Sequence, residues 1–555
     1  MSKKKVYKKG SILLLLIFII STSFSDNREA SSNDYFEITK NLKILASIYE
    51  RVNNYYVDES LPGELMKKAI DAMLASLDPY TVYIPESNIE DFRLITTGQY
   101  GGIGASIIKQ GDHVVIAEIY ENSPAHQSEI SVGDTLLEID HVIITGKSIE
   151  EISRALKGAS ESMVTIKKQN DLITEEITVT RKKINIPSVP FYGLVEEGIG
   201  YVKLTSFTDK ASQEVGLAIS NLKANENINK LILDLRGNGG GLLMQAVDIV
   251  NFFIPKDQLV VETKGRMQEI NRVYKTRNQP IDLNIPLVIL VDSYSASASE
   301  IVSGALQDLD RAVVVGLNTF GKGLVQQTKD LKFGAKIKLT VAKYYTPSGR
   351  CIQKLDYSNK NFAGDAGIIA DSLIKVHQTK NNREVKDSRG VDPDIIVEQE
   401  YYSKLAETLI YNDHIFNFVN GYIKENQEIP SIEEFAFSDE EFSLFSNYLN
   451  GKNIEYSNNI HDELLQLINT AKKEKYFEEN TSLFNNLENN LKPNLKEDLQ
   501  RNKQDVKRII ESEIISRVYF QKGRIEASLK DDPYVKQAEE ILLDTVRYKR
   551  ILNIN

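Results

Sequence analysis

The chain has 555 residues, of which 41% are hydrophobic and 26% are charged, which is enough for about three or four soluble globular domains. Its net charge of −11 argues against a nucleic-acid partner, because such a partner favours a basic surface. The single cysteine, Cys351, excludes an intramolecular disulfide framework. The six histidines are scattered without the spacing of a metal site, so we expect no metal and no other cofactor.

The first 25 residues have the parts of a secretory signal peptide. A lysine-rich start precedes an unbroken apolar run from Ile12 to Ile20, and small residues follow up to Ser25. This run is shorter than the roughly 20 residues that a transmembrane helix needs. We therefore expect residues 1–25 to direct the chain out of the cytoplasm, into the periplasm. An uncleaved segment would instead anchor it in the membrane.

Residues 34–95 are predicted to form an N-terminal helical region. Apolar residues recur at steps of three and four from Ile38 to Val52, which indicates one amphipathic helix. Pro62 suits the first position of a second helix, which should end before the turn at Leu77 to Tyr80.

Residues 96–182 resemble a PDZ domain in the order of their predicted elements. Strands are expected at 106–109, 114–119, 135–139, 163–168 and 175–180, with a short helix between Ser123 and Val132 and a second helix at 148–156. A PDZ domain binds a peptide by adding it as a strand and by capturing its carboxylate on backbone N–H groups. The segment predicted to do so comprises Gly101, Gly102, Ile103 and Gly104. The alternative is a glycine-rich turn in an ordinary small β domain.

Residues 184–400 alternate strand-like and helix-like runs, which indicates an α/β core. Within the core, residues 357–390 form a polar insertion that we interpret either as a flexible loop or lid, or as a disordered insertion without a role. Residues 401–555 are predicted to be helical, with apolar stripes that serve as core or as a subunit contact, such as that of a homodimer. The last helix is expected to begin at Asp532-Pro533 and to bury a stripe of Ala538, Ile541, Leu542 and Val546.

A Ser/Ala run at 292–300 carries the strongest chemical signal. It lies between a strand-like run (285–291) and a helix-like run (301–309), where a turn can expose a serine hydroxyl. Serine needs a base to act as a nucleophile, and no histidine lies near. Lys322, between two glycines, is the candidate base, because apolar neighbours favour its neutral amine. Taken alone, the serine run could be a helix cap and the lysine a solvated surface charge.

A glycine-rich segment, Gly237 to Gly241, follows a predicted strand (230–235) and opens a predicted helix (242–253). Free N–H groups at such a helix start can stabilise an oxyanion. The rival interpretation is a dinucleotide-binding loop, but the glycine spacing does not match the Gly-x-Gly-x-x-Gly pattern.

Together these segments resemble the carboxyl-terminal processing (tail-specific) proteases of the S41 peptidase family, from about Asp34 to Val397. The resemblance implies that Ser297 is the nucleophile, that Lys322 is the general base and that Gln326 orients the lysine. It further implies a crotonase-like core and a PDZ domain that gates the active site. The implied oxyanion donors are the N–H of Ala298 and that of either Gly239 or Gly240.

We therefore expect a multidomain α/β and α protein with an N-terminal helical segment, a PDZ β-domain, a protease core and a helical C-terminal region. Its expected function is that of a secreted serine endopeptidase that recognises protein C-terminal tails and cleaves with a Ser/Lys dyad. Its partners would be protein and peptide substrates with free C-termini. The alternative is a catalytically inactive PDZ-bearing scaffold, against which the intact set of Ser297, Lys322 and Gln326 argues. A Ser-His-Asp protease is disfavoured because three histidines lie within the PDZ segment.

Overall fold

The computed structural model describes residues 32–170, 173–361, 364–398, 401–426 and 428–554, so the predicted signal peptide lies outside the described residues. Two compact units divide between Tyr83 and Ile84. The first contains α2 (Ser32–Tyr55) and α3 (Pro62–Ala75), and Pro62 occupies the first turn of α3 as predicted. Among the described helices, none has the length and apolar character needed to cross a membrane.

The second unit begins with a helix and a β domain that match the predicted PDZ order. Its sheet runs β3-β4-β5-β7-β8, with β6 paired to β5; the bounds are β3 (Ala105–Gln110), β4 (His113–Ile119), β5 (Thr135–Ile139), β6 (Val142–Ile143), β7 (Met163–Asn170) and β8 (Ile173–Thr180). Helix α4 (Ile89–Thr97) leads into β2 (Gln99–Gly102), which pairs with β9 (Lys182–Asn185). Helix α5 (Ile149–Leu156) is set by a capping box between Ser148 and Glu151.

The predicted short helix between Ser123 and Val132 is wrong, because this stretch forms turns. The Ser123 hydroxyl donates to the Gly104 carbonyl and accepts the N–H of His126. Such local side-chain bonds compete with the helical hydrogen-bond pattern.

The predicted α/β core is built on a six-stranded sheet of order β10-β11-β12-β15-β16-β23. Only β10 runs antiparallel to its neighbour. The strands are β10 (Phe191–Glu196), β11 (Ile199–Lys203), β12 (Lys230–Asp234), β15 (Leu287–Val291), β16 (Val313–Gly316) and β23 (Ile395–Ile396). The hydrophobic runs of the central strands are buried throughout, which is typical of a parallel sheet covered on both faces.

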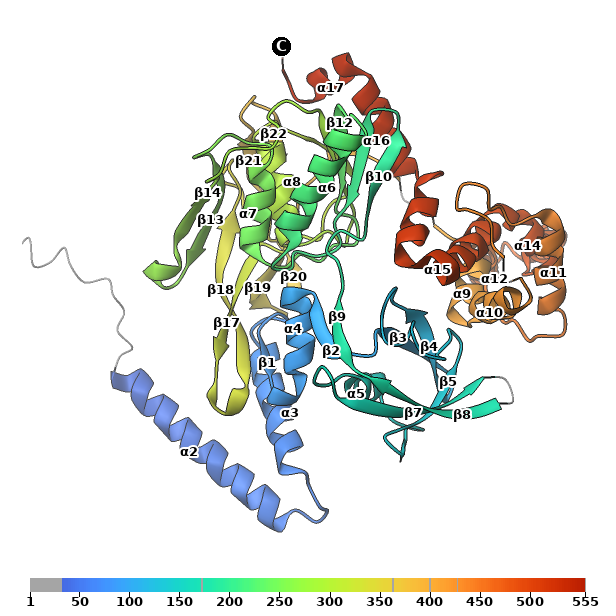
Figure 1. Ribbon diagram of the computed structural model, residues 1–555, viewed down its shortest axis with the longest axis horizontal. Coiled ribbons are helices and arrows are strands. Elements are labelled where there is room, and N and C mark those ends of the chain that lie inside the picture. The colour runs from blue at the N-terminus through green and yellow to red at the C-terminus, as the bar shows by residue number, and fades with distance from the viewer. Residues whose placement is uncertain (1–31, 171–172, 362–363, 399–400, 427, 555) are drawn as a thin grey trace, which may run out of the picture. The chain divides into compact units, whose positions relative to one another are not determined.

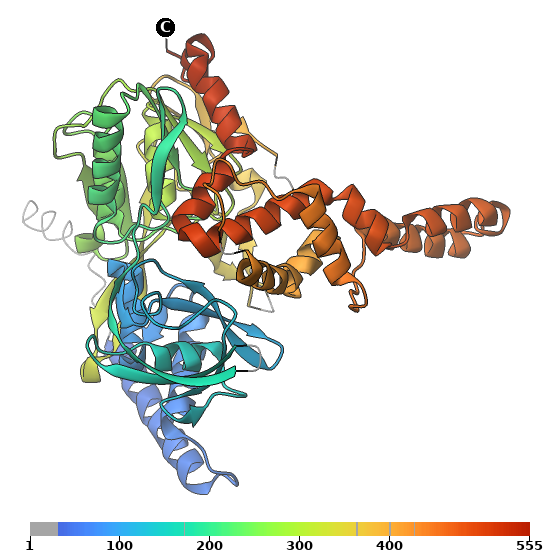
Figure 2. The ribbon, with the colours of Figure 1, turned by 45° about the vertical axis from the view of Figure 1, so that its right-hand side comes forward.

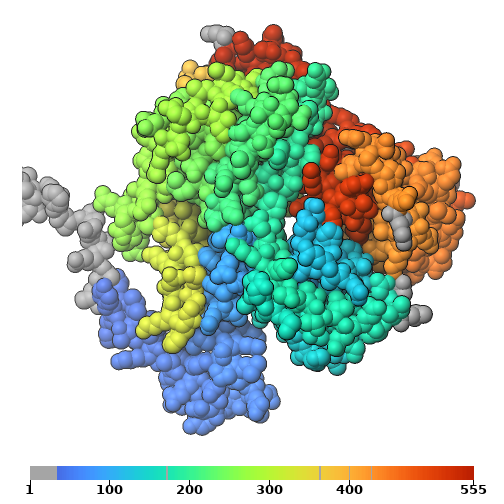
Figure 3. Space-filling view, viewed as in Figure 1, coloured from blue at the N-terminus to red at the C-terminus, as the bar shows by residue number. Residues whose placement is uncertain are grey.

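Helices cover the two faces of this sheet in different ways (Figure 1). One face packs against α6 (Ala211–Asn225), α7 (Leu243–Asn251) and α8 (Ala298–Asp308). The other face packs against the last two helices of the chain, α16 (Pro533–Leu543) and α17 (Thr545–Ile551). In the space-filling view, the core segment is coloured from green to yellow, and red atoms of the C-terminal segment lie along its upper edge (Figure 3). The C-terminal segment therefore completes the hydrophobic core around this sheet.

A second, antiparallel sheet of the core contains β14, β13, β18 and β17 in this order. Its strands are β13 (Leu259–Gly265), β14 (Arg272–Lys275), β17 (Leu324–Asp330) and β18 (Lys336–Tyr345). The insertion folds as two small hairpins, β19 (Leu355–Lys360) with β20 (Ala366–Ile368) and β21 (Val376–Gln378) with β22 (Glu384–Lys386). Arg383 ties the second hairpin to the core through Asp310 and Asp394, at 2.6 and 2.5 Å. The second hairpin of the insertion is therefore anchored to the core. The role of the insertion as a lid stays a prediction.

The C-terminal region is helical, as predicted (orange to red in Figure 2), and most of its helices before α16 share a hydrophobic cluster distinct from that of the core sheet. Its helices are α9 (Lys404–Tyr411), α10 (His414–Glu425), α11 (Asp439–Leu449), α12 (Asn459–Lys473), α13 (Thr481–Leu491), α14 (Leu495–Arg501) and α15 (Lys503–Leu529). In the last helices, Ala538, Ile541 and Leu542 are buried as predicted. Val546 is exposed instead, because α16 ends at Leu543 and the new helix α17 changes the helical phase.

Candidate active site

Ser297 lies at the junction of β15 and α8, one residue before the helix begins. Its backbone has φ 56° and ψ −108°, a combination that costs free energy in a residue other than glycine. Its side chain is only half-buried. A strained strand-to-helix turn of this kind is a way to present a nucleophilic hydroxyl.

The neighbouring serines of the run have structural hydrogen bonds instead. Ser295 and Ser299 are fully buried, and their hydroxyls donate to the carbonyls of Leu235 and Asn238 at 2.9 and 2.8 Å. These bonds attach the serine turn to the glycine loop that follows β12. Of these three serines, Ser297 is therefore the one with solvent access.

Glu300, in the first turn of α8, joins the serine turn to the lysine loop. One of its oxygens, Oε2, accepts the N–H of Ser297 at 2.8 Å and the N–H of Lys322 at 2.9 Å. The other, Oε1, accepts from the Thr319 hydroxyl at 2.6 Å and the Gly321 N–H at 2.7 Å. Burial raises the pKa of Glu300, and these four hydrogen bonds offset that effect only in part. The predicted nucleophile and base are thus brought together through one buried carboxyl group.

The lysine loop is shaped by its two glycines. Gly321 has φ 87°, and a Cβ there would lie 2.5 Å from the Cβ of Lys354. The N–H of Gly323 donates to the Gln353 side chain at 2.8 Å. Between them Lys322 is half-buried. A side chain on either glycine would therefore displace the loop that carries the predicted base.

Gln326 lies on β17, four residues after Lys322. Its side-chain amide donates to the Thr340 hydroxyl on the paired strand β18, at 3.2 Å. This contact restricts the rotation of the Gln326 side chain. Its predicted contact with Lys322 stays a prediction.

Tyr344, on β18, contacts both the serine turn and the lysine loop. Its hydroxyl donates to the carbonyl of Ser297 at 3.0 Å, and its N–H donates to the carbonyl of Gly323 at 2.9 Å. Burial raises the pKa of Tyr344 well above its ordinary value, and the nearby Glu300 adds to the effect. The neutral hydroxyl is therefore a permanent donor to the backbone of the serine turn.

The predicted oxyanion loop lies beside Ser297. A Cβ on Gly240 would lie 2.9 Å from both the Cβ of Ser297 and the nitrogen of Ala298, so only glycine fits there. The Gly240 N–H donates to the Asn238 side chain at 2.9 Å, whereas a Cβ on Gly239 would meet no atom within 4 Å. Ala298 is the first residue of α8, where backbone N–H groups have no partner within the helix. The choice between Gly239 and Gly240 as oxyanion donor stays open.

The predicted PDZ site has a groove of about 200 Å³ between β3 and α5. Apolar and small side chains line it, together with Lys157; they are Leu94, Tyr100, Ile103, Ala105, Ser106, Ile107, Tyr120, Ile149, Ser153 and Leu156. Of the four predicted residues, Gly101 and Gly102 end strand β2, and Ile103 and Gly104 form the turn into β3. Gly104 has φ 78°, and a Cβ there would lie 2.2 Å from that of Ser123. The glycine-rich turn therefore stands at one end of the groove.

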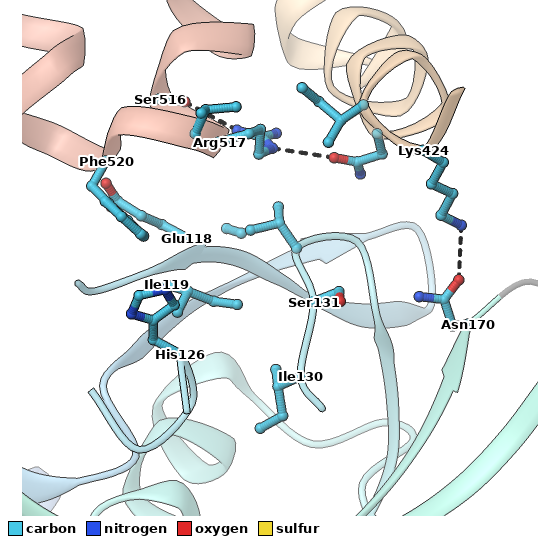
Figure 4. Close-up of a pocket in the computed structure, with 15 residues that line it drawn as sticks. Glu118, Ile119, His126, Ile130, Ser131, Asn170, Lys424, Ser516, Arg517 and Phe520 are labelled. Atoms are coloured by element: carbon cyan, nitrogen blue, oxygen red, sulfur yellow. Dashed lines mark hydrogen bonds between the residues drawn. The ribbon is translucent and has the colours of Figure 1, made fainter. Parts of the chain in front are cut away.

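A larger cavity of about 390 Å³ lies between the β domain and helices α10 and α15 (Figure 4). On its helical side, Arg517 of α15 donates to Asn420 of α10 at 3.2 Å, and Lys424 of α10 donates to Asn170 of the β domain at 2.8 Å. His126 contacts the ring of Phe520 edge to face, with 4.9 Å between ring centroids. None of the predicted catalytic residues lines this cavity. Although this cavity is larger than the groove between β3 and α5, it is therefore not the predicted reaction site.

Sequence reasoning named Ser297 and Lys322 but missed two residues that hold them, Glu300 and Tyr344. A glutamate three residues after a helix-capping serine is a capping-box pattern, which could have identified Glu300 as a partner of the Ser297 N–H. Its bonds to Thr319, Gly321 and Lys322 are tertiary and leave no local pattern. The same holds for the contact of Tyr344 with Ser297.

Three family models match the chain. The model of peptidase family S41 matches residues 198–359, and the PDZ domain model matches 115–169. A third model, described as the C-terminal helical domain of a probable PDZ-protease, matches 405–542. With the turn at Ser297, these matches define a PDZ-bearing serine-type peptidase. The chain belongs to peptidase family S41, among the relatives named carboxy-terminal-processing proteases.

Two curated relatives cover most of the chain. It is 31% identical to the carboxy-terminal-processing protease of Bartonella bacilliformis, over 76% of this chain and 87% of the relative. It is 30% identical to a probable CtpA-like serine protease of Staphylococcus aureus strain MSSA476, over 83% of this chain and 91% of the relative. Among solved structures, the photosystem II D1 C-terminal processing protease shares 26% identity, over 64% of this chain and 92% of that one, with a TM-score of 0.35.

Proposed function

We propose that this peptidase is a secreted endopeptidase that recognises the C-terminal tail of a protein through its PDZ domain and cleaves with a dyad of Ser297 and Lys322. The observation that carries the dyad is the shared carboxyl group of Glu300, which accepts the N–H groups of both residues. Of Ser295, Ser297 and Ser299, only Ser297 is exposed enough to meet a substrate. No second function is favoured by an observation of comparable weight.

In the proposed reaction, the Ser297 hydroxyl oxygen attacks the scissile carbonyl carbon while the neutral amine of Lys322 takes its proton. The C–N bond then breaks, and Lys322 returns the proton to the leaving amine. Water repeats the sequence on the acyl-enzyme and releases the new C-terminus. Gln326 offers an amide oxygen to hold Lys322 in place, because its amide nitrogen already donates to Thr340.

The oxyanion that forms in each step needs N–H donors that are already in place. Ala298 supplies one from the first position of α8, and Gly239 or Gly240 supplies the other. If Gly240 serves, its N–H must leave the Asn238 side chain, since the two are hydrogen-bonded at 2.9 Å.

Tail recognition is proposed for the groove between β3 and α5. Its apolar lining suits an apolar C-terminal side chain, and β3 offers an edge to which a peptide strand can add. The turn at Gly104 would place backbone N–H groups near the terminal carboxylate. Export to the periplasm is proposed from the basic and apolar pattern of residues 1–25.

The test is digestion of an unstructured reporter protein with an apolar C-terminus, beside the same reporter with a charged tail. The wild type and Ser297→Ala are compared in parallel, together with labelling by a serine-reactive probe. Cleavage and labelling by the wild type alone, faster for the apolar tail, are expected. Cleavage without tail preference would keep the dyad and remove the tail-recognition proposal. Absence of both cleavage and labelling in the wild type would favour the inactive scaffold.

A further inference from the structure

Arg236, the residue just before the glycine loop, is held by the C-terminal segment of the chain. Its guanidinium forms two bonds to Asp532, from Nη1 to Oδ1 at 3.0 Å and between Nη2 and Oδ2 at 2.7 Å. The ring of Tyr534 lies against the same guanidinium, 4.8 Å from its central carbon. A bidentate ion pair combined with stacking fixes a guanidinium in both position and plane.

The remaining contacts of Arg236 fix the point where the loop begins. Its Nη2 lies 2.6 Å from the buried Asp234, and its own N–H donates to the same carboxylate at 2.8 Å. Lys203 donates to the carbonyl of Arg236 at 2.9 Å and lies 3.2 Å from Asp234. Burial lowers the pKa of Arg236, but Asp234 and Asp532 raise it more, so the guanidinium stays charged. Side chain and backbone of Arg236 are therefore fixed together.

The other side of the loop is attached to the serine turn. The Asn238 carbonyl accepts the N–H of Ala296 and the hydroxyl of Ser299, at 3.0 and 2.8 Å. The N–H of Gly237 donates to Asp292 at 3.0 Å. Gly237 and Asn238, the two residues after Arg236, are thus bonded to the serine turn. A displacement of Arg236 would therefore also displace the backbone beside Ser297.

The position of Asp532 is set independently of the loop. It caps α16, accepting the N–H groups of Tyr534 and Val535, and α16 packs its apolar face onto the core sheet. Residues 198–359 match the S41 family model, so Asp532 and Tyr534 lie outside the matched protease segment. Asp532 and Tyr534, which we call the clamp, therefore come from a separate part of the chain and hold the residue that precedes the predicted oxyanion loop.

We propose that Asp532 and Tyr534 are positioning residues for the hydrolytic reaction, which hold Arg236 and thereby the loop 237–241 in register with Ser297. The proposal rests on the proposed function of this loop as the oxyanion site. It makes the C-terminal helix α16 a requirement of turnover, beyond its share in the hydrophobic core. Binding of a substrate tail to the PDZ groove should not depend on the clamp.

The test variant is Asp532→Asn, because asparagine caps a helix about as well as aspartate but removes the charge paired with Arg236. We expect kcat on the unstructured reporter to fall about 10- to 100-fold, the cost of a small misplacement in an active site. KM and the affinity for a C-terminal peptide should change less than about 2-fold, since the tail-binding groove lies elsewhere. The rate of labelling by the serine-reactive probe should fall in parallel with kcat.

Two further variants separate positioning from stability. Asp544→Asn alters the cap of the adjacent helix α17, which has no bond to Arg236, and should keep the wild-type kcat. Asp532→Glu retains the charge and should recover part of the lost rate. A kcat of Asp532→Asn equal to that of the wild type would overturn the proposal. So would a loss of kcat that disappears at a temperature well below the Tm of the variant. Failure of the proposed function itself would differ, since the wild type would then show neither cleavage nor labelling.

Discussion

Ser297 and Lys322 donate their backbone N–H groups to the same atom, Oε2 of Glu300, at 2.8 and 2.9 Å. One carboxyl group thus joins the backbone of the proposed nucleophile to that of the proposed base. Glu300 is fully buried, so water cannot take its place as the acceptor of these four hydrogen bonds. Small changes at this residue should therefore act on the reaction rather than on substrate binding.

The first prediction concerns Glu300→Gln. An amide has one acceptor oxygen and one donor nitrogen, so in either orientation two of the four donors would face an N–H group. We expect kcat to fall about 10- to 100-fold with little change in KM, because the Ser297 and Lys322 loops separate slightly. The check is steady-state kinetics on the unstructured reporter. Ser303→Ala is the matched control, since Ser303 is a buried polar residue of α8 that bonds only within the helix. Equal losses in both variants would contradict the assigned role of Glu300.

The pH dependence of stability supplies a second prediction. Burial raises the pKa of Glu300 in the folded state, so its contribution to stability is fully present below its unfolded-state pKa of about 4.3. This contribution is lost as the pH rises through the folded-state pKa. Glu300→Gln does not titrate, so the Tm of wild type minus that of the variant should decrease as the pH rises from about 4, the unfolded-state pKa of a glutamate, through the raised folded-state pKa. A difference that is constant or grows over this range would show that the charged carboxylate is the favoured form.

Lys322→Ala tests the proposed base. Without a proton acceptor, Ser297 is a weak nucleophile, and turnover should be lost while binding of a C-terminal peptide is retained. Lys329→Ala removes an exposed lysine from the same strand region and should behave as the wild type. Residual cleavage by Lys322→Ala close to the wild-type rate would eliminate lysine as the base.

Much of the core could be predicted from sequence because its signals are local. The continuous apolar runs of β12, β15 and β16 indicate buried parallel strands, and the small-residue turn before α8 marks the place of the serine. The glycines at 237–241 likewise mark the loop that lies beside Ser297, where a Cβ on Gly240 would clash. The predicted bounds of these segments differ from the observed ones by a few residues at most; for β12 the prediction is 230–235 and the strand is Lys230–Asp234.

The contacts that organise the site could not be predicted in this way, because they join distant parts of the chain. Asp532 and Arg236 are separated by 296 positions, and neither stands in a pattern that names the other. The short helix expected after Ser123 was wrong for a related reason, since the Ser123 hydroxyl bonds to the distant Gly104 carbonyl. Local propensity decided elements, whereas tertiary hydrogen bonds decided the geometry of the site.

Tail recognition gives a fourth prediction, at Gly102. An aspartate there would add a negative charge beside the expected position of the terminal carboxylate, and its Cβ would lie 2.6 Å from the Tyr100 ring. We expect at least about 10-fold weaker binding of peptides that end in a free carboxylate. Gly111→Asp is the control, because Gly111 has φ 59°, which aspartate tolerates, and no atom lies within 4 Å of the added Cβ. Peptides with an amidated C-terminus should bind poorly to the wild type. Equal binding of acid and amide would rule out carboxylate capture.

The last prediction concerns the hydroxyl of Tyr344. Tyr344→Phe removes one hydrogen bond to the Ser297 carbonyl, but the N–H of Ile301 still donates to the same oxygen at 2.9 Å. The loss of stability should therefore be modest, about 1 kcal/mol, as expected for a single hydrogen bond. The effect on turnover should be larger in proportion, because the strained backbone of Ser297 loses a support that opposes its relaxation. Denaturant unfolding and kcat measured on the same preparations check both parts, with Tyr345→Phe as the neighbouring control. A variant that loses stability yet retains the full kcat would show that the turn at Ser297 does not depend on the Tyr344 hydroxyl.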